Sequence, residues 1–483
     1  MRDQVLVLNL NDAASRAVTR KLRAERVLAK IVPGDITLSE IREQDPLGLV
    51  LAGGTESETI PALNGAVLGC GLPVLALGQP CLSLLYALGG RAGDVLAPAG
   101  MGRLSCPEGT PFAPLDGTER MLPPLRELIL PEGAVPVCLA ENGAVGFSLR
   151  DRALYGAQFQ VEAVDPEGAL LLKHFALNVC CCTTWWDEDA FTAQAVEEIK
   201  RIVGGGRALC ALTGGLDSCV TALLAFKALG RNLKCLFVDT GLLRQGEAEA
   251  ILAFYRDEIG MDVRFVRAEE RFLSALRGVS DPRAKRRIIA DTLQAVLNEE
   301  RPLLGPAEVL FRGTSSNDIM FSPRQDRPTL DASLPVIEPV RELFKDEIRH
   351  VGDFLSVPGD LMSRQDFPAA GLAVRILGEV TEERLAVLRK ADEIFRGEVR
   401  RSGAEKRLWQ YFAVLCPMPE DENGAVICLR AVHASEQSLA YAARLPYDVT
   451  EAAVEQIMRS VPQVRRVVYD LTPSTHYAGI EWQ

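Results

Sequence analysis

The segment that constrains the fold most strongly is a strand pattern that runs directly into two glycines and then into a helix pattern. The apolar run "RALCAL" ends at Leu212, "TGGLDS" follows, and the helix pattern continues to Leu229. The next apolar run, "LKCLFVDT", has the pattern of a strand again. Strands that alternate with helices in this way predict a parallel α/β sheet.

The N-terminal part of the chain shows the same alternation and predicts another sheet of this kind. The runs "VLVLNL", "GLVLAGG" and "PVLALG" alternate there with helical stretches. Because 483 residues exceed what one core usually fills, two or three domains are expected. We predict α/β domains at residues 1–180 and 181–363 and a smaller α+β domain at residues 364–483, which begins near a Pro/Ala/Gly loop.

The two glycines are also the strongest chemical signal in the sequence. A strand end and a helix start converge there, so backbone N–H groups and the helix dipole point at one spot, which suits a phosphate. Glycine lets the backbone approach a ligand closely, and Thr213 and Ser218 can add hydroxyl donors. The pattern lacks the G-x-x-x-x-G-K-[ST] spacing of a Walker A loop. A glycine-rich turn that only packs a helix onto a sheet is the alternative interpretation.

Composition excludes several classes of partner. The formal net charge of -12 argues against nucleic acid or an anionic membrane, because both attract clustered Lys and Arg. The uncharged stretch Thr59–Gly90 is long enough to span a bilayer, but its prolines and glycines predict a buried strand, turn and helix instead. The N-terminus is not expected to be a signal peptide. Twelve scattered cysteines then predict reduced thiols and a cytoplasmic protein.

The loop at Thr213 resembles the SGGxDS pyrophosphate loop of ATP pyrophosphatases, which cleave ATP between the α- and β-phosphates. Three further segments, "FVDTGLLRQGEAEAIL", "ERFLSALRGVSDPRAKRRIIA" and "PVRELFKDEIRHVG", are similar to the GMP synthase family. The resemblance covers nearly the whole chain. It implies a flavodoxin-like class I amidotransferase domain, a parallel α/β ATP pyrophosphatase domain (adenine nucleotide alpha hydrolase-like), and a small α+β dimerisation domain.

The resemblance also implies roles for individual residues, with ATP and Mg²⁺ as cofactors and no residue assigned to the metal. Pyrophosphate would be held by Thr213, Gly214, Gly215, Leu216, Asp217 and Ser218, with Asp239 beside the nucleotide. The implied catalytic residues are Lys285, Lys345 and Asp346. A lysine in these motifs would offset the charge that develops on the α-phosphate. By composition alone, each lysine could equally lie on a solvated helix face. The implied acceptor contacts are Arg341, Arg375 and Glu481.

The glutaminase motifs of the family are degenerate in this chain. A class I glutaminase needs a thiolate, a histidine that activates it, a carboxylate and an oxyanion hole. The family's "GICYG" turn aligns with Ala76–Pro80, which places Gly78 at the nucleophile position. The family's "QFHPE" is "QFQVE" here, so Gln160 replaces the histidine while Glu162 remains.

Cys81 could in principle substitute for the missing nucleophile. It lies about one turn inside the helix that follows, away from the tight turn. Residues 1–173 contain no histidine that could activate it. We therefore predict that Cys81 is an inert core residue and that the domain folds without hydrolysing glutamine.

The acceptor motifs are altered as well. The family's "FPGPGLGVR" is "FPAAGLAVR" at residues 367–375, and the lysine of its C-terminal motif is absent. We expect a ligase that adenylylates XMP or a related purine carbonyl and aminates it with free ammonia, as a homodimer. A paralogue with another carbonyl acceptor and an ATP-binding pseudoenzyme or scaffold are the alternatives. Whether a separate protein supplies ammonia stays open.

Overall fold

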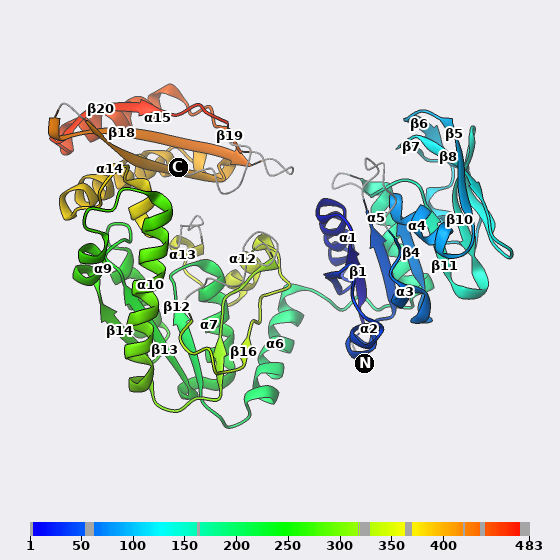
Figure 1. Ribbon diagram of the computed structural model, residues 1–483, viewed down its shortest axis with the longest axis horizontal. Coiled ribbons are helices and arrows are strands. Elements are labelled where there is room, and N and C mark those ends of the chain that lie inside the picture. Colours follow the sequence, from blue (N-terminus) through cyan, green and yellow to red (C-terminus); the bar gives the residue numbers. More distant parts are fainter. Residues whose placement is uncertain are drawn as a thin grey trace. The chain divides into compact units, whose positions relative to one another are not determined.

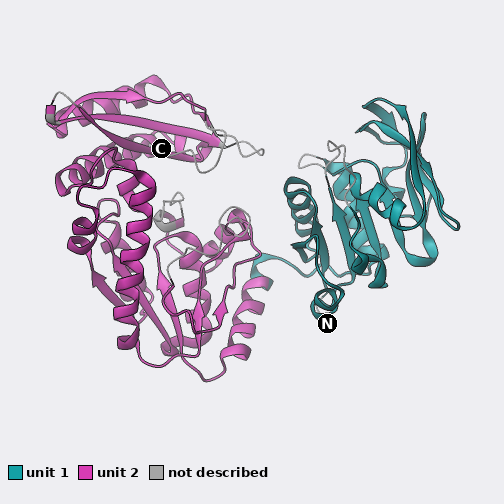
Figure 2. Cartoon of the chain, in the orientation of Figure 1, with its two compact units in different colours: residues 1–190 teal, residues 191–483 magenta. Residues whose placement is uncertain are grey.

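The computed structural model describes residues 3–53, 62–161, 165–316, 318, 329–362, 370–418, 421–434 and 440–473. The chain divides into two compact units, Met1–Ala190 and Phe191–Gln483 (Figure 2). The predicted boundary at residue 180 falls inside the first unit. Apart from residues 181–190, the predicted second and third domains lie together in the second unit. The division into three domains therefore stays a prediction.

The first unit is built on a seven-stranded sheet with the order β2-β1-β3-β4-β11-β10-β9. Its strands are β1 (Val5–Asn9), β2 (Ala29–Pro33), β3 (Gly48–Ala52), β4 (Val74–Leu77), β9 (Val135–Ala140), β10 (Gly143–Leu149) and β11 (Leu154–Ala157). Neighbours from β2 to β11 are parallel, whereas β10 and β9 continue the sheet antiparallel. Three of the predicted strands are β1, β3 and β4.

Both faces of this sheet are buried. Along β1, Val5 and Val7 enter one hydrophobic cluster and Leu6 and Leu8 enter another. Helices α1 (Asp12–Ala24) and α5 (Pro166–His174) contribute side chains to the first cluster, and α2 (Leu38–Gln44) and α4 (Gln79–Ala87) contribute to the second. Burial on both faces explains the continuous apolar runs in the sequence and confirms the predicted α/β class.

Two short antiparallel pairs extend the first unit, β5 (Arg91–Ala97) with β8 (Leu125–Ile129) and β6 (Gly100–Arg103) with β7 (Glu119–Leu122). These strands carry many exposed residues in the described structure, including the paired Met101 and Met121. They lack the continuous apolar pattern of the main sheet, and the sequence did not predict them.

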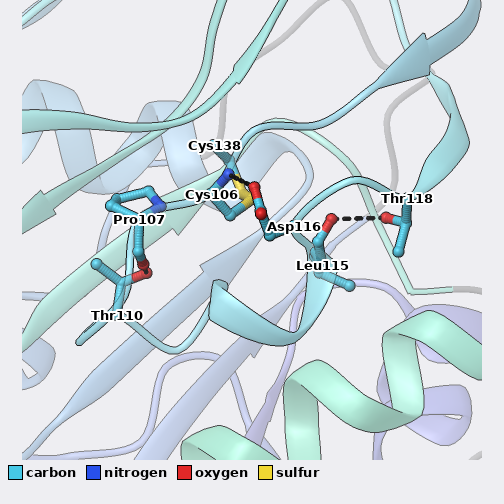
Figure 3. Close-up of a disulfide and its surroundings, with 7 residues drawn as sticks. All are labelled: Cys106, Pro107, Thr110, Leu115, Asp116, Thr118 and Cys138. Atoms are coloured by element: carbon cyan, nitrogen blue, oxygen red, sulfur yellow. Dashed lines mark hydrogen bonds between the residues drawn. A yellow bond between two sulfur atoms is a disulfide. The ribbon is translucent and has the colours of Figure 1, made fainter.

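Cys106 and Cys138 form a disulfide in this part of the first unit (Figure 3). An isolated antiparallel bridge between Ser105 and Leu139 places the two neighbouring cysteines across from each other, with Cα atoms 4.3 Å apart. The N–H of Cys106 also donates to the Asp116 carboxylate at 2.8 Å. The expectation of twelve reduced thiols is therefore wrong for this pair. The sequence could not show the pairing, because the two cysteines are 32 positions apart and only the fold brings them together.

Helix α6 (Glu188–Val203) begins at the end of the first unit and continues into the second. The second unit contains a five-stranded parallel sheet with the order β14-β13-β12-β15-β16 (Figure 1). Its strands are β12 (Ala208–Leu212), β13 (Leu233–Asp239), β14 (Val263–Arg267), β15 (Val309–Phe311) and β16 (Val336–Ile337). The chain adds β13 and β14 on one side of β12 and later adds β15 and β16 on the other. A sheet of this topology binds ligands at the carboxyl ends of its strands, where the order reverses.

A second sheet follows near the C-terminus. It contains β17 (Gln410–Met418), β18 (Asp421–Ala434), β19 (Ala440–Ala442) and β20 (Val464–Tyr469), with helices α14 (Glu382–Arg401) and α15 (Tyr447–Ser460). One hydrophobic cluster joins both parts of the second unit, since it includes Leu242 and Ile289 as well as Phe395 and Ala413. This continuous core explains why the two parts form one compact unit.

Among the residues that the structure describes, no helix has both the length and the apolar character needed to cross a membrane. The described part of the uncharged stretch Thr59–Gly90 forms α3 (Gly65–Gly69), β4 and α4, which are all short. The predicted strand, turn and helix are therefore found there, with Gly78 at the turn and Pro80 in the first turn of α4.

Candidate active site

The predicted phosphate loop connects β12 to α7 (Leu216–Leu229) at the carboxyl end of the central strand. Gly214 has a φ of +74°, and Gly215, which has no side chain, occupies the N-cap of α7. The Ser218 hydroxyl accepts from the Thr213 N–H at 3.2 Å and donates to the Ala211 carbonyl at 3.4 Å. The loop is thus held in shape by its own residues, with the helix N-terminus directed at its mouth.

A second loop, which follows β15, packs directly against the phosphate loop. A Cβ at Gly313 would lie 2.5 Å from the Ser218 nitrogen and 2.7 Å from the Asp217 carbonyl carbon. In the same loop, the Thr314 hydroxyl donates to Glu338 at 2.6 Å, and the Ser315 N–H donates to Asp318 at 2.9 Å. Only a glycine therefore allows this approach, and hydrogen bonds fix the loop that makes it.

Lys345 lies beside the phosphate loop, although 128 positions separate it from Asp217. Its Nζ is 2.6 Å from a carboxylate oxygen of Asp217, and the side chains are 22% and 11% exposed. Lys345 is the first residue of α12 (Lys345–Phe354), and Asp346 follows it in the first turn. The structure therefore brings a predicted catalytic cation to the predicted phosphate site.

Asp239 ends β13, which is the direct neighbour of β12 in the sheet. Its carboxylate accepts from the Gly241 N–H at 2.9 Å, and this bond shapes the turn after the strand. Asp239 therefore belongs to the same carboxyl edge of the sheet as the phosphate loop. This is the arrangement expected of a residue beside a bound nucleotide.

Lys285 contacts a different segment from Lys345. It lies in the first turns of α10 (Pro282–Glu300), and its side chain is completely buried. Its Nζ donates to the backbone carbonyls of Ala373 and Ile376 at 3.0 Å and 2.7 Å. Burial, together with the positive charge of Arg384, lowers the pKa of this ammonium to about 8.

The predicted acceptor residues occupy different environments. The guanidinium of Arg375 is buried over the ring of Phe412, 4.0 Å from its centroid. Arg341 is 40% exposed and pairs with Glu338 at 2.9 Å. Glu481 lies outside the described residues. The structure therefore places Arg375 in the core of the second unit and Arg341 on a loop near Thr314, which shares the partner Glu338.

The degenerate glutaminase turn keeps an unusual backbone. Gly78 connects β4 to α4 with φ of +74° and ψ of -139°, a conformation that glycine adopts without strain. Its N–H donates to the carbonyls of Ala157 and Phe159 at 3.0 Å and 2.8 Å. The turn therefore lies directly beside the strand end that leads to Gln160, while Glu162 lies outside the described residues.

Arg120 of β7 occupies the neighbourhood of Gln160. Its Nη2 donates to the Gln160 carbonyl at 3.1 Å and pairs with Asp165 at 2.8 Å, and its guanidinium lies 3.9 Å from the ring centroid of Phe159. Sequence reasoning missed this residue, because a single arginine 40 positions before Gln160 gives no signal. These contacts hold the chain where the family carries its catalytic histidine.

Cys81 is fully buried in a hydrophobic cluster of the first unit. Burial raises the pKa of its thiol well above the usual range, so the thiol stays protonated and is a poor nucleophile. The prediction that Cys81 is a core residue is confirmed.

Comparison with known proteins identifies the family. The family model described as "GMP synthase C terminal domain" matches residues 397–482. A protein named "GMP synthase [glutamine-hydrolyzing]" from Caldicellulosiruptor saccharolyticus is 38% identical to this chain over 507 positions, which cover 99% of both chains. A protein of the same name from Clostridium perfringens strain 13 is 35% identical over 521 positions, which cover 100% of both chains.

A protein of the same name from Clostridium botulinum strain Langeland is 35% identical over 527 positions, with 100% of both chains covered. A crystal structure of a putative GMP synthase subunit from Thermoplasma acidophilum matches 37% of this chain and 94% of its own, at 21% identity and a TM-score of 0.31. The full-length similarity to curated relatives is decisive: this chain belongs to the GMP synthase family.

Proposed function

We propose that this protein is an ATP-dependent ligase that converts XMP to GMP with free ammonia as the nitrogen donor. A carbonyl oxygen of the purine attacks the α-phosphate of ATP, and pyrophosphate leaves. Ammonia then adds to the adenylylated carbon, and AMP leaves with the oxygen. The phosphate loop next to Lys345, at the carboxyl edge of a parallel sheet, is the observation that carries this proposal.

The residues present fit such a reaction. The N–H groups of the Thr213–Ser218 loop and the N-terminus of α7 can hold the pyrophosphate. Lys345 can offset negative charge that develops on the phosphates, since its ammonium already lies at the loop. Asp239 ends the neighbouring strand β13, where it would lie beside a bound nucleotide.

A magnesium ion would balance the charge of ATP, and the loop fits it. The described residues contain no cluster of three or more His, Cys, Asp or Glu side chains suited to a metal. Mg²⁺ commonly needs only one or two protein carboxylates when the substrate phosphates supply the other ligands. Asp217 is the carboxylate placed to serve it, and Lys345 would then turn to the phosphates.

Free ammonia is proposed as the donor because the nucleophile and the histidine of the glutaminase site are missing. The relatives are named glutamine-hydrolyzing, whereas this chain has Gly78 at the nucleophile position and Gln160 at the histidine position. The buried thiol of Cys81 offers no replacement. Arg120 instead holds the segment at Gln160 through a hydrogen bond to the Gln160 carbonyl and an ion pair with Asp165. These contacts support a structural role for this domain.

A different carbonyl acceptor is the second candidate, and the altered "FPAAGLAVR" segment favours it. The packing of that segment weakens the argument, however. Ala370 and Ala373 are buried in the hydrophobic cluster of the second unit, so these two added methyl groups fill core space and do not by themselves indicate a different acceptor. XMP is therefore the preferred acceptor in this proposal.

A cytoplasmic homodimer completes the proposal. The family similarity of residues 397–482 supports a dimerisation role for the C-terminal sheet and its helices. Several large apolar side chains in that region are exposed in the single chain, namely Tyr441, Tyr447, Met458, Val468 and Leu471. Burial of such side chains between two copies would provide apolar contact area. Sedimentation equilibrium at several concentrations tests the dimer.

The catalytic proposal is tested by incubating the protein with ATP, Mg²⁺, XMP and ammonium, and by measuring GMP, AMP and pyrophosphate together. Equal amounts of the three products are expected. ATP binding without any product would reject the ligase and favour a pseudoenzyme. Pyrophosphate release that requires another purine carbonyl compound would favour the second candidate.

A further inference from the structure

Lys285 reaches from the start of α10 to a segment that lies about ninety positions later in the chain. The side chain is completely buried, and its ammonium donates to the carbonyls of Ala373 and Ile376 at 3.0 Å and 2.7 Å. These carbonyls lie at the end of the short helix Gly371–Arg375, where helix carbonyl groups lack partners within the helix. A buried lysine is costly unless its charge is hydrogen-bonded, so these bonds account for its presence.

The segment that Lys285 holds, residues 370–377, is anchored at two other points. At one end, the Leu372 N–H donates to the Leu242 carbonyl at 2.8 Å. Gly371 has a φ of +60° and lies so close to Leu242 that a side chain would collide with its backbone. At the other end, the Leu377 N–H donates to Leu415 of β17 at 2.9 Å.

The first of these anchors lies next to the proposed ATP site. Leu242 follows the end of β13 at Asp239 by three residues, on the carboxyl edge of the parallel sheet. Segment 370–377 therefore connects this edge to the C-terminal sheet. Lys285 is the side chain that fastens the middle of the connection to α10.

We infer that Lys285 is a positioning residue for the purine acceptor. By holding Ala373 and Ile376, it fixes segment 370–377 against the nucleotide edge, and the acceptor site is formed only when that segment is in place. Lys285 then acts on acceptor binding through the backbone, whereas Lys345 acts at the phosphate loop. This inference rests on the proposed function, because it names the acceptor as the purine substrate of the same reaction.

Steady-state kinetics of Lys285→Met test the inference. Methionine has a similar length but cannot donate to the two carbonyls. Because each bond is charge-assisted, the KM for XMP should rise about tenfold or more, while the KM for ATP stays unchanged and kcat falls by less than about threefold. Lys390→Met removes an exposed lysine of α14, with a side chain 52% exposed, and should leave all three constants unchanged.

A drop of kcat by about a hundredfold with both KM values unchanged would overturn the inference, because Lys285 would then act on the reacting atoms. Unchanged constants in Lys285→Met would overturn it too. Hydrogen–deuterium exchange supplies a readout without turnover: amides of residues 370–377 should exchange faster in the variant, while those of residues 213–218 do not change. Wild-type protein that forms no GMP would refute the proposed function and leave the exchange result as the test of the anchor.

Should Lys285→Met fail to fold, Gly371→Ala disturbs the same segment from its other anchor, since its Cβ would collide with Leu242. It should raise the KM for XMP and leave the KM for ATP unchanged. An equal rise of both KM values in this variant would contradict a role confined to the acceptor.

Discussion

The contact between Gly313 and the phosphate loop gives the most quantitative prediction. In Gly313→Ala, the added Cβ would lie 2.5 Å from the Ser218 nitrogen, 2.6 Å from its Cα and 2.7 Å from the Asp217 carbonyl carbon. All three atoms belong to the backbone, so no side chain can rotate away. Ordinary contact begins at 3.4 Å, so the two loops must separate by about 1 Å.

A displacement of about 1 Å at a catalytic site can lower activity about a hundredfold, which corresponds to about 2.7 kcal/mol of transition-state stabilisation. The assay is GMP formation from XMP, ATP and ammonium, with circular dichroism to show that the variant is folded. Gly397→Ala is the matched control, because a Cβ at that position of α14 meets nothing within 4 Å. A folded Gly313→Ala protein with activity within threefold of wild type would contradict this prediction.

Three further predictions concern the first unit. Gly78→Cys should lower the free energy of unfolding by about 1–3 kcal/mol, because a backbone φ of +74° is strained for a residue with a side chain. The variant should release no glutamate from glutamine. Glutamate release would mean that another base replaces the histidine. Burial raises the pKa of Cys81 above 9.0, so in native protein iodoacetamide should modify the exposed Cys181 and spare Cys81. Above pH 9.0 the Cys81 thiol stays protonated in the folded state, whereas the unfolded chain loses this proton. The free energy of unfolding should therefore fall as the pH rises above 9.0, and it should fall less in Cys81→Ala. Denatured, unreduced protein should titrate with ten thiols and reduced protein with twelve. Closing the loop between Cys106 and Cys138 should stabilise the protein by about 3–4 kcal/mol, and twelve thiols before reduction would contradict the disulfide.

The main sheets could be predicted because strands that are buried on both faces consist of continuous apolar runs, which are visible in the sequence. Such runs coincide with the strands β1, β3, β4, β12 and β13. The pairs β5–β8 and β6–β7 could not be predicted, since their exposed residues dilute the pattern. A single core that includes Leu242 and Phe395 likewise has no local pattern in the sequence, because it joins side chains that lie far apart along the chain.

The candidate site divides in the same way. The conformation of the loop at residues 213–218 could be predicted because its six residues are consecutive between a strand pattern and a helix pattern. Its role in holding phosphate stays a prediction. The family resemblance implied a catalytic role for Lys345, but its pairing with Asp217 was not predicted, because a distance of 128 positions carries no local pattern. The Arg120 clamp and the Lys285 contacts became visible only in three dimensions, since they join a side chain to distant backbone carbonyls.

In the proposed reaction ammonia, and not glutamine, supplies the new amino group. The direct measurement is a competition in which the protein receives ATP, Mg²⁺ and XMP with ammonium that carries heavy nitrogen and glutamine that carries ordinary nitrogen. Mass spectrometry of the GMP then reports the source of the amino group. We expect GMP that carries heavy nitrogen only, at a rate that glutamine does not change. GMP whose amino group carries the glutamine nitrogen would contradict it.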